Sequence, residues 1–416
     1  MKTKLLLLLI VIFSSLANAQ EEKCGEKEKQ LNQYLVDAEY QKALETWEDV
    51  KILCPSYSEK IYLLGNKVLQ YQIENANSKD KEDKVNALLQ LYDQFDKYYP
   101  NNKNGNFEKR ALALIINKVG KPDNLFSYLN KAFEKEKETF ANSQAVYVYF
   151  EMYFDLYKQN KSIIPLEELI DKYCAVSYLI SENSRKFTFK KEEFNRVSLG
   201  IELLMKDILT KENMIPYAQK KLEINSSDTS WLEPTAKVLS LLCKNSPVFG
   251  SVASKLDNVR PTSTSSYYLA TYNLNTGNQN KAIEFYKKSA ELATDSIEKA
   301  TIYYSIATIL SNSDKATAEK MVLNALVNNP INGRYFIFLA NLYANSVNDC
   351  GANENERSAI YKLASTTALK AIAVEPRLKP TADAMSAEYL KKVTLNSDSK
   401  VNSVKIGCWI QQTVKF

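Results

Sequence analysis

The stretch SYYLATYNLNTGNQNKAIEFYKKSAELA, residues 266–293, decides the fold of this 416-residue chain. It consists of two segments with helical apolar spacing, joined by the turn Thr276-Gly277-Asn278. The stretch KATIYYSIATILSNSDKATAEKMVLNALVNNP, residues 299–330, has the same arrangement. These two stretches predict helical hairpins that follow one another along the chain.

The second helix of each hairpin repeats one spacing of side chains. Three residues lie at relative positions 0, +4 and +7, which share one face of a helix, and a proline at +12 ends the hairpin. A small residue at position 0 lets a neighbouring helix approach. The complete spacing occurs at Ala43-Trp47-Val50-Pro55, Ala318-Val322-Ala325-Pro330 and Ala364-Ala368-Ala371-Pro376, and the first three positions recur at Ala282-Tyr286-Ser289.

The composition favours an extended repeat array or several domains, because 416 residues exceed what one hydrophobic core usually serves. Apolar residues make up 45% of the chain, and the low counts of 10 Gly and 11 Pro argue against long flexible linkers. The 54 basic and 49 acidic residues are mixed evenly, so the charge pattern does not favour nucleic acid as a partner.

The region from about 260 to 376 resembles the tetratricopeptide repeat, because Ala270 and Ala282 lie twelve residues apart with Gly277 in the turn between them. The segment DAEYQKALETWEDVKILCP, residues 37–55, is similar to the second helix of that repeat, whereas residues 100–256 keep only the hairpin pattern. The resemblance implies an all-α, helical-hairpin solenoid. We expect a short extended C-terminal tail, because residues 403–416 are rich in β-branched side chains.

The overall layout resembles exported tetratricopeptide proteins of Bacteroidota, with cysteines flanking the first hairpin, a weakly repetitive middle and a C-terminal GCWI sequence. The expected segments are a signal peptide (1–19), an N-terminal hairpin repeat (20–75), degenerate hairpin repeats (76–260), tetratricopeptide repeats (261–380), and a capping helix with the tail (381–416).

The N-terminus has the features of an export signal. Lys2 and Lys4 precede an apolar run, and Ala17-Asn18-Ala19 supplies the small residues of a cleavage site. We expect cleavage after Ala19; an uncleaved anchor is the alternative. The expected location is the periplasm or the periplasmic face of the outer membrane, without membrane insertion after cleavage and in possible association with an outer-membrane complex.

Six cysteines in an exported chain predict disulfides. Cys24 begins the first hairpin and Cys54 ends it, and antiparallel helices bring those two points together. Cys350 in an expected loop and Cys408 near the C-terminus form the second candidate pair. Cys174 and Cys243 are left over, and buried thiols are the alternative for all six.

The sequence lacks the residues of common catalytic and metal sites. It contains no histidine, no C-x-x-C pair and no glycine-rich phosphate loop. Adjacent carboxylates such as Glu167-Glu168 point in different directions on a helix. We therefore expect no enzymatic activity and no cofactor; an enzyme using two distant carboxylates, such as a glycosidase, is a remaining alternative.

The tetratricopeptide resemblance implies that the first helices of the hairpins line a concave, partner-binding face. Counting from the small residues places nine side chains there: Tyr267, Thr271, Asn275, Tyr304, Thr308, Asn312, Arg334, Asn341 and Asn345. The recurring asparagines suggest a row of amides that holds a peptide backbone, since each amide donates and accepts. The alternative is that asparagine only terminates these helices.

The expected function is therefore an exported scaffold or adaptor that recognises a peptide segment or a partner protein on its concave face. The alternative is a glycan- or nutrient-binding component of an outer-membrane uptake system. The three tryptophans, Trp47, Trp231 and Trp409, are few and scattered for a sugar-stacking platform.

Overall fold

The computed structural model describes residues 20–394 and 402–416, so the expected signal peptide lies outside the described residues. The described chain is helical apart from turns and one pair of short strands. It divides into two compact units, Met1–Lys206 and Asp207–Phe416, and the division falls inside the segment 76–260. No helix in the described ranges is long and apolar enough to cross a membrane.

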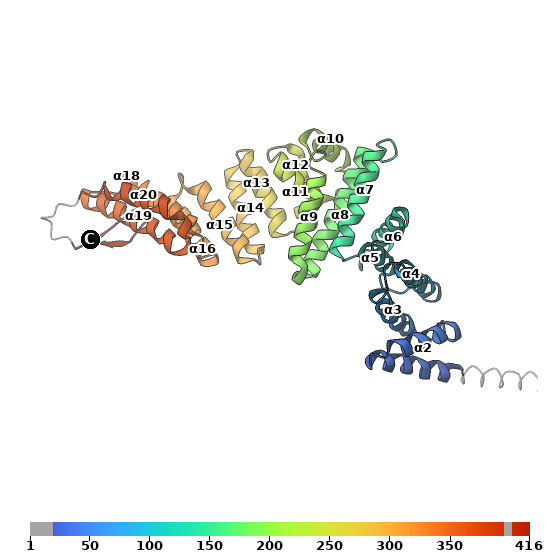
Figure 1. The fold of residues 1–416 in the computed structure, drawn as a ribbon. Coiled ribbons are helices and arrows are strands. Elements are labelled where there is room, and N and C mark those ends of the chain that lie inside the picture. The colour runs from blue at the N-terminus through green and yellow to red at the C-terminus, as the bar shows by residue number, and fades with distance from the viewer. Residues whose placement is uncertain (1–19, 395–401) are drawn as a thin grey trace, which may run out of the picture. The chain divides into compact units, whose positions relative to one another are not determined.

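The first unit is a series of helices that pack on their sequence neighbours (Figure 1). Contacts also link next-but-one helices such as α5 and α7, as stacked hairpins require. The described part begins with helical residues 20–36 and continues with α2 (Tyr40–Leu53), α3 (Glu59–Glu74), α4 (Lys81–Tyr98), α5 (Asn106–Asn117), α6 (Pro122–Lys135), α7 (Ser143–Gln159), α8 (Leu166–Lys186), η1 (Thr188–Lys190) and α9 (Lys191–Leu204).

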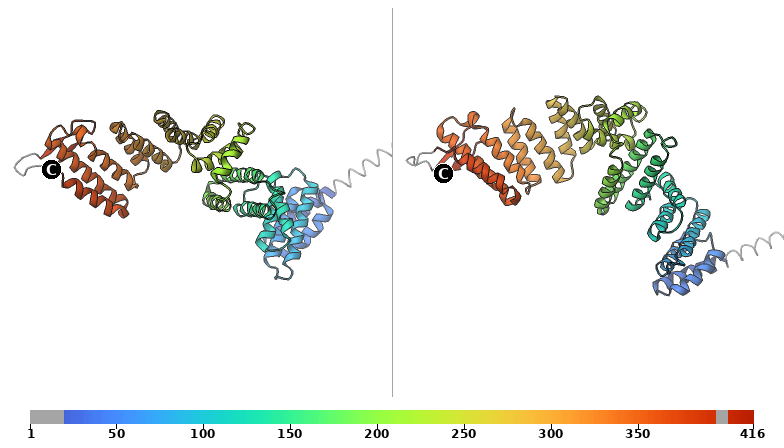
Figure 2. Two further views of the ribbon diagram at one scale, coloured as in Figure 1. Left: turned by 90° about the horizontal axis from the view of Figure 1, so that it is seen from above. Right: turned by 45° about the horizontal axis from the view of Figure 1, so that its top comes forward.

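The second unit contains the most regular hairpins, in which α13 packs on α14, α15 on α16 and α17 on α19. Both views of Figure 2 show these pairs in sequence order. The elements are α10 (Lys211–Lys221), α11 (Thr229–Leu242), α12 (Pro247–Val259), α13 (Ser263–Asn275), α14 (Gln279–Leu292), α15 (Ser296–Leu310), α16 (Lys315–Asn328), α17 (Gly333–Ala344), α18 (Val347–Cys350), α19 (Glu354–Val374), η2 (Pro376–Leu378), α20 (Lys379–Leu390), β1 (Ser403–Lys405) and β2 (Thr413–Lys415). The predicted all-α, tetratricopeptide-like solenoid is confirmed.

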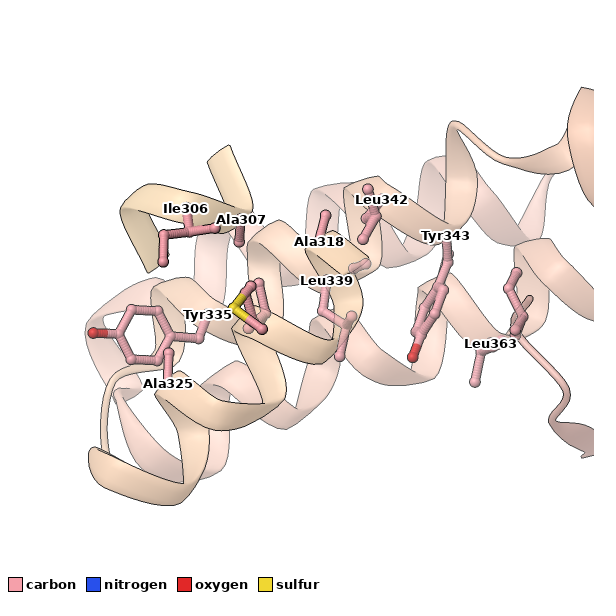
Figure 3. Packing of buried hydrophobic residues seen from close by; sticks show 14 of the residues in the cluster. Ile306, Ala307, Ala318, Ala325, Tyr335, Leu339, Leu342, Tyr343 and Leu363 are labelled. Carbon is pink, nitrogen blue, oxygen red and sulfur yellow. The ribbon is translucent and has the colours of Figure 1, made fainter. Parts of the chain in front are cut away.

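The repeated spacing marks packing positions, as the sequence predicts. Figure 3 shows Ala318 and Ala325 of α16 in the hydrophobic cluster of the second unit. A small side chain here lets α15 and α16 pack closely, and Ala307 supplies the matching small residue on α15. The side chains at positions 0, +4 and +7 are at most 4% exposed in all four copies: Ala43, Trp47, Val50, Ala282, Tyr286, Ser289, Ala318, Val322, Ala325, Ala364, Ala368 and Ala371.

The prolines end three of these second helices at the same point. The residues before them are Cys54, Asn329 and Glu375, and each donates its N–H to the carbonyl oxygen of the +7 residue at 2.8–2.9 Å. Their φ angles of −133°, −144° and −142° lie outside the helical range. A following proline disfavours the helical conformation, so the chain turns into the next hairpin there.

The C-terminal tail is part of the core of the second unit. Strands β1 and β2 pair antiparallel, with Val404 opposite Val414, and pack on α19. Ile406, Ile410 and Val414 are buried in the same cluster as the hairpins. The predicted extended tail is therefore a two-stranded hairpin that covers the last repeat.

Two disulfides are present, one in the first hairpin and one that joins α18 to the C-terminal tail. Cys24 joins Cys54 with a Cα–Cα distance of 5.8 Å, and Cys350 joins Cys408 at 5.2 Å. Cys350 was expected in a loop but ends the short helix α18, because its N–H donates to the carbonyl oxygen of Ser346 at 2.8 Å. The remaining cysteines, Cys174 and Cys243, are buried.

Candidate functional site

The nine side chains that the sequence suggests for partner binding come from α13, α15 and α17 of the second unit. The ring of Tyr304 on α15 lies 5.0 Å from that of Tyr335 and 5.3 Å from that of Phe338, so α15 and α17 meet along this face. Six of the nine are exposed: Asn275, Thr308, Asn312, Arg334, Asn341 and Asn345. The structure thus leaves six of the nine side chains exposed and brings α15 and α17 together at Tyr304.

Two of the four asparagines on this face already use side-chain atoms in hydrogen bonds within the protein, and a third is bonded through its backbone. The amide of Asn275 donates to the carbonyl oxygen of Thr271 at 2.7 Å. The side-chain oxygen of Asn341 accepts from the hydroxyl of Tyr389 at 2.7 Å. The backbone carbonyl of Asn345 accepts from Lys315 at 2.7 Å. The geometry at Asn275 favours its helix-terminating role, since the bond lies within its own last turn.

The other predicted positions on this face are partly covered. Thr271 is buried at 7% exposure, and Tyr267 and Tyr304 are half-buried. The ring of Tyr267 packs edge-on against Tyr286, a +4 position of the repeated spacing, at 5.3 Å. These three side chains therefore pack within the hairpins as much as they line the exposed face.

Tryptophan does not form a sugar-stacking platform in this structure. Trp47 and Trp231 are 3% and 4% exposed, so their faces are closed to a ligand. Trp409 is half-buried and stacks on Tyr343 with ring centroids 6.1 Å apart. The arrangement therefore lends no support to the glycan-binding alternative.

A second candidate surface lies on the first unit, on either side of α3. The outward side of α3 presents Leu63, Lys67, Gln70 and Glu74, all exposed. Between α3 and the helix over residues 20–36 lies a hollow of about 310 Å³. Its lining consists of Asn32, Leu35, Val36, Tyr40, Lys67, Gln70, Tyr71 and Glu74.

A second hollow, of about 290 Å³, lies between α3 and α5. Its floor is apolar and buried, whereas Ile116 at its edge is 69% exposed. Gln70 and Glu74 line both hollows, so the two adjoin across the C-terminal half of α3. The lining residues of the second hollow are Gln70, Ile73, Glu74, Leu88, Tyr92, Lys109, Leu112, Ala113, Ile116 and Asn117.

Close packing on α2 and α4 sets the position of α3. Gly65 leaves room for the indole of Trp47, because a Cβ at position 65 would lie 1.9 Å from its Nε1. The rings of Tyr40 and Tyr71 stack 3.6 Å apart, and the hydroxyl of Tyr92 donates to the side-chain oxygen of Asn66 at 2.6 Å.

Arg110 fixes α5 against α4. Its guanidinium, only 2% exposed, pairs with Asp93 at 2.9 Å and Asp96 at 2.8 Å. The rings of Tyr92 and Phe107 lie 5.6 and 5.1 Å from the guanidinium carbon. A buried cation with two carboxylates defines one register between the two helices, since losing either carboxylate would weaken the compensation of the buried charge.

Two carboxylates hold the helix ends near α5. Glu136 accepts from the N–H of Phe107 at 3.0 Å, and Glu108 accepts from the N–H groups of Ala141 and Asn142 at 2.8 and 2.6 Å. Burial raises the pKa of both carboxyl groups above the ordinary value of 4.5, although the backbone donors oppose that rise.

Three polar side chains of α3 remain open around the hollows. The side chains of Lys67, Gln70 and Glu74 make no hydrogen bond or ion pair with any residue in the described ranges. Lys109, by contrast, donates to the side-chain oxygen of Asn104 at 2.5 Å, and burial lowers its pKa. An incoming ligand therefore meets three open polar side chains in a row.

Sequence reasoning overlooked this surface because α3 and α5 lack the tetratricopeptide signature. The available signals were the polar steps Lys67, Gln70 and Glu74 on one helix face, and the outward Ile116 on a helix whose other aliphatic residues point inward. Neither signal shows that the two helices are neighbours; that information comes from the fold.

No protein-family model matches this chain, and no curated protein sequence matches it. Among solved structures, it is similar to one described as the crystal structure of the APC/C hetero-tetramer Cut9-Hcn1, at 15% identity and a TM-score of 0.28. That similarity covers 89% of this chain and 76% of the other. At these values it assigns neither family nor function, and the class rests on the hairpins themselves: a tetratricopeptide-like solenoid protein.

Proposed function

We propose that this protein is an exported, non-enzymatic scaffold that binds another protein through the face formed by residues 20–36, α3 and α5. The observation that carries the proposal is the pair of adjoining hollows that share Gln70 and Glu74. A partner segment lying on α3 would enter both hollows and would meet the open side chains of Lys67, Gln70 and Glu74. Concave sites with an apolar floor and a few polar groups are typical of binding sites.

Two features support the exported location. The sequence at residues 1–19 has the composition of a signal peptide, and four cysteines lie in two disulfides. Disulfides persist in oxidising compartments and are rare in the cytosol. The proposed site of action is the periplasm or the periplasmic face of the outer membrane.

The exposed face of α13, α15 and α17 is the second binding surface in this proposal. The side chains of Asn312 and Arg334 are exposed there, and Tyr304 of α15 makes an aromatic contact with Phe338 of α17. A scaffold with one binding face on each unit would join two partners or two parts of one partner.

Affinity purification of the mature protein from its producing cell, after mild cross-linking, tests the proposal. The double variant Gln70→Ala/Ile116→Ser removes an amide and an apolar edge, and Ile52→Ser is the matched control, since Ile52 is 72% and Ile116 69% exposed. We expect a stoichiometric partner with the wild type and the control that is missing with the double variant, whereas any partner of the second surface is recovered with all three proteins. Equal recovery of every partner from all three proteins would overturn the assignment to this face.

A further inference from the structure

We propose that the α3 face binds an extended peptide segment in which an acidic and a basic side chain lie three residues apart with an apolar side chain between them. The inference rests on the proposed function and names the chemistry of the partner at the same site. It follows from the distance between the charges of Lys67 and Glu74, from the position of α3 between the two hollows, and from the lining of those hollows.

The charges on α3 set the spacing. Lys67 and Glu74 both face outward and are seven residues apart, which corresponds to about 10 Å along a helix axis. An extended chain covers about the same distance in three residues. Because neither charge has a partner among residues 20–394 and 402–416, an acidic group is favoured beside Lys67 and a basic group beside Glu74.

The position of α3 between the two hollows favours an extended partner over a helical one. Hollows lie on both sides of α3, and Gln70 and Glu74 line both of them. Successive side chains of an extended chain point to opposite sides, so a segment lying along α3 places them alternately in the two hollows. A helix presents one apolar stripe and fits a single groove instead.

The two hollows differ in their linings, so each suits a different kind of partner side chain. The hollow between α3 and α5 has Ile73 and Leu88 in its floor and Leu112 and Ile116 beside them, which suits an apolar side chain. The hollow on the other side contains Asn32 and Lys67 and suits polar groups. Gln70 lies between the two charges, where its amide can both donate to and accept from a peptide backbone.

Two peptide isomers of identical composition test this chemistry. The first, Gly-Ser-Asp-Leu-Ser-Lys-Gly-Ser, has its charges three residues apart, and the second, Gly-Ser-Leu-Asp-Lys-Ser-Gly-Ser, has them adjacent. Each carries a fluorescent label, and binding to the full mature chain is measured by fluorescence anisotropy. We expect the first to bind about threefold more tightly at low salt, because adjacent charges can pair with only one of Lys67 and Glu74 at a time.

Variants of the protein test whether the first peptide binds at the α3 face. Ile116→Ser should weaken the first peptide about fivefold through lost apolar contact, whereas Ile52→Ser should leave its affinity unchanged. Glu74→Gln should weaken it about threefold at low salt and reduce the salt dependence of its affinity. Equal affinity of the two isomers, no binding of either, or the same effect of Ile116→Ser and Ile52→Ser would overturn the inference.

The outcome is separable from that of the proposed function. If the cross-linked partner depends on Gln70 and Ile116 but the isomers bind alike, the face is a protein-binding site and only the peptide chemistry is wrong. If the double variant also recovers the partner as the wild type does, both proposals fail.

Discussion

Gly65 on α3 lies so close to Trp47 on α2 that a Cβ at position 65 would be 1.9 Å from the indole Nε1. Trp47 is also the +4 residue of the repeated spacing and is 3% exposed. This contact sets how near α3 approaches α2. The two hollows beside α3 therefore depend on it.

The variant Gly65→Ala should destabilise the protein by about 2–3 kcal/mol, because the buried indole must move to admit the methyl group. The matched control is Gly277→Ala, where φ is +84° and nothing lies within 4 Å of the added Cβ. That change should cost only the backbone strain, about 1 kcal/mol. Urea unfolding curves give both values; equal losses would contradict the close approach.

Removing the second disulfide should loosen the C-terminal hairpin. The bond joins Cys350 to Cys408, 58 residues apart in sequence, so Cys350→Ser/Cys408→Ser should cost about 2–4 kcal/mol. Hydrogen exchange should then rise at β1, β2 and the adjoining end of α17. Cys24→Ser/Cys54→Ser is the control and should raise exchange only in the first unit. Unchanged protection of β2 in the first variant would show that packing alone holds the tail.

Asp257 should make the second unit sensitive to acid. Its carboxylate accepts from Ser265, Ser266 and Lys288 at 2.6–2.9 Å. Burial pushes the pKa of Asp257 upward, but Lys288 and the two hydroxyls outweigh it and hold the pKa below its ordinary value of 3.8. The stabilisation is then present above pH 3.8 and is lost as the pH falls through the lower folded pKa.

The variant Asp257→Asn should flatten the acid limb of the stability curve and reduce the free energy of unfolding at pH 7 by about 1.5–3 kcal/mol. Urea unfolding between pH 2.5 and 7 measures both effects. Parallel curves for the variant and the wild type would contradict the depressed pKa.

Glu108 should act in the opposite direction. Burial raises the pKa of its carboxyl group above 4.5, so its stabilising contribution is present below pH 4.5 and is lost as the pH rises through the folded pKa. Glu108→Gln keeps a carbonyl oxygen for the N–H groups of Ala141 and Asn142 but cannot ionise. Its free energy of unfolding should fall less between pH 4.5 and neutrality than that of the wild type; an identical fall would assign the effect to other groups.

Local sequence patterns predicted the hairpins and their packing positions because the signal lies within one helix. Ala318, Val322 and Ala325 share a face whatever surrounds them, and Pro330 ends the helix through its own covalent geometry. The proposed asparagine row is different, because Asn341 depends on a distant neighbour. Tyr389, 48 residues away, donates to Asn341, and no local pattern indicates that contact.

The hollows beside α3 were beyond sequence reasoning for the same physical reason. Val36, Gln70 and Ile116 come from three helices separated by long stretches of chain, and only the packing of α2 and α4 places them on one surface. The local signs were the polar steps of Lys67, Gln70 and Glu74 and the exposed Ile116. A single outward apolar residue does not by itself mark a contact site, since Ile52 is exposed to a similar extent.

Site-specific photo-cross-linking in the producing cell tests the central claim most directly. A photoreactive amino acid replaces Gln70 between the hollows or, as the control, the exposed Ile52 at the end of α2. The account predicts a discrete cross-linked protein from position 70 and none from position 52. Absence of an adduct at position 70, or the same adducts from both positions, would contradict it.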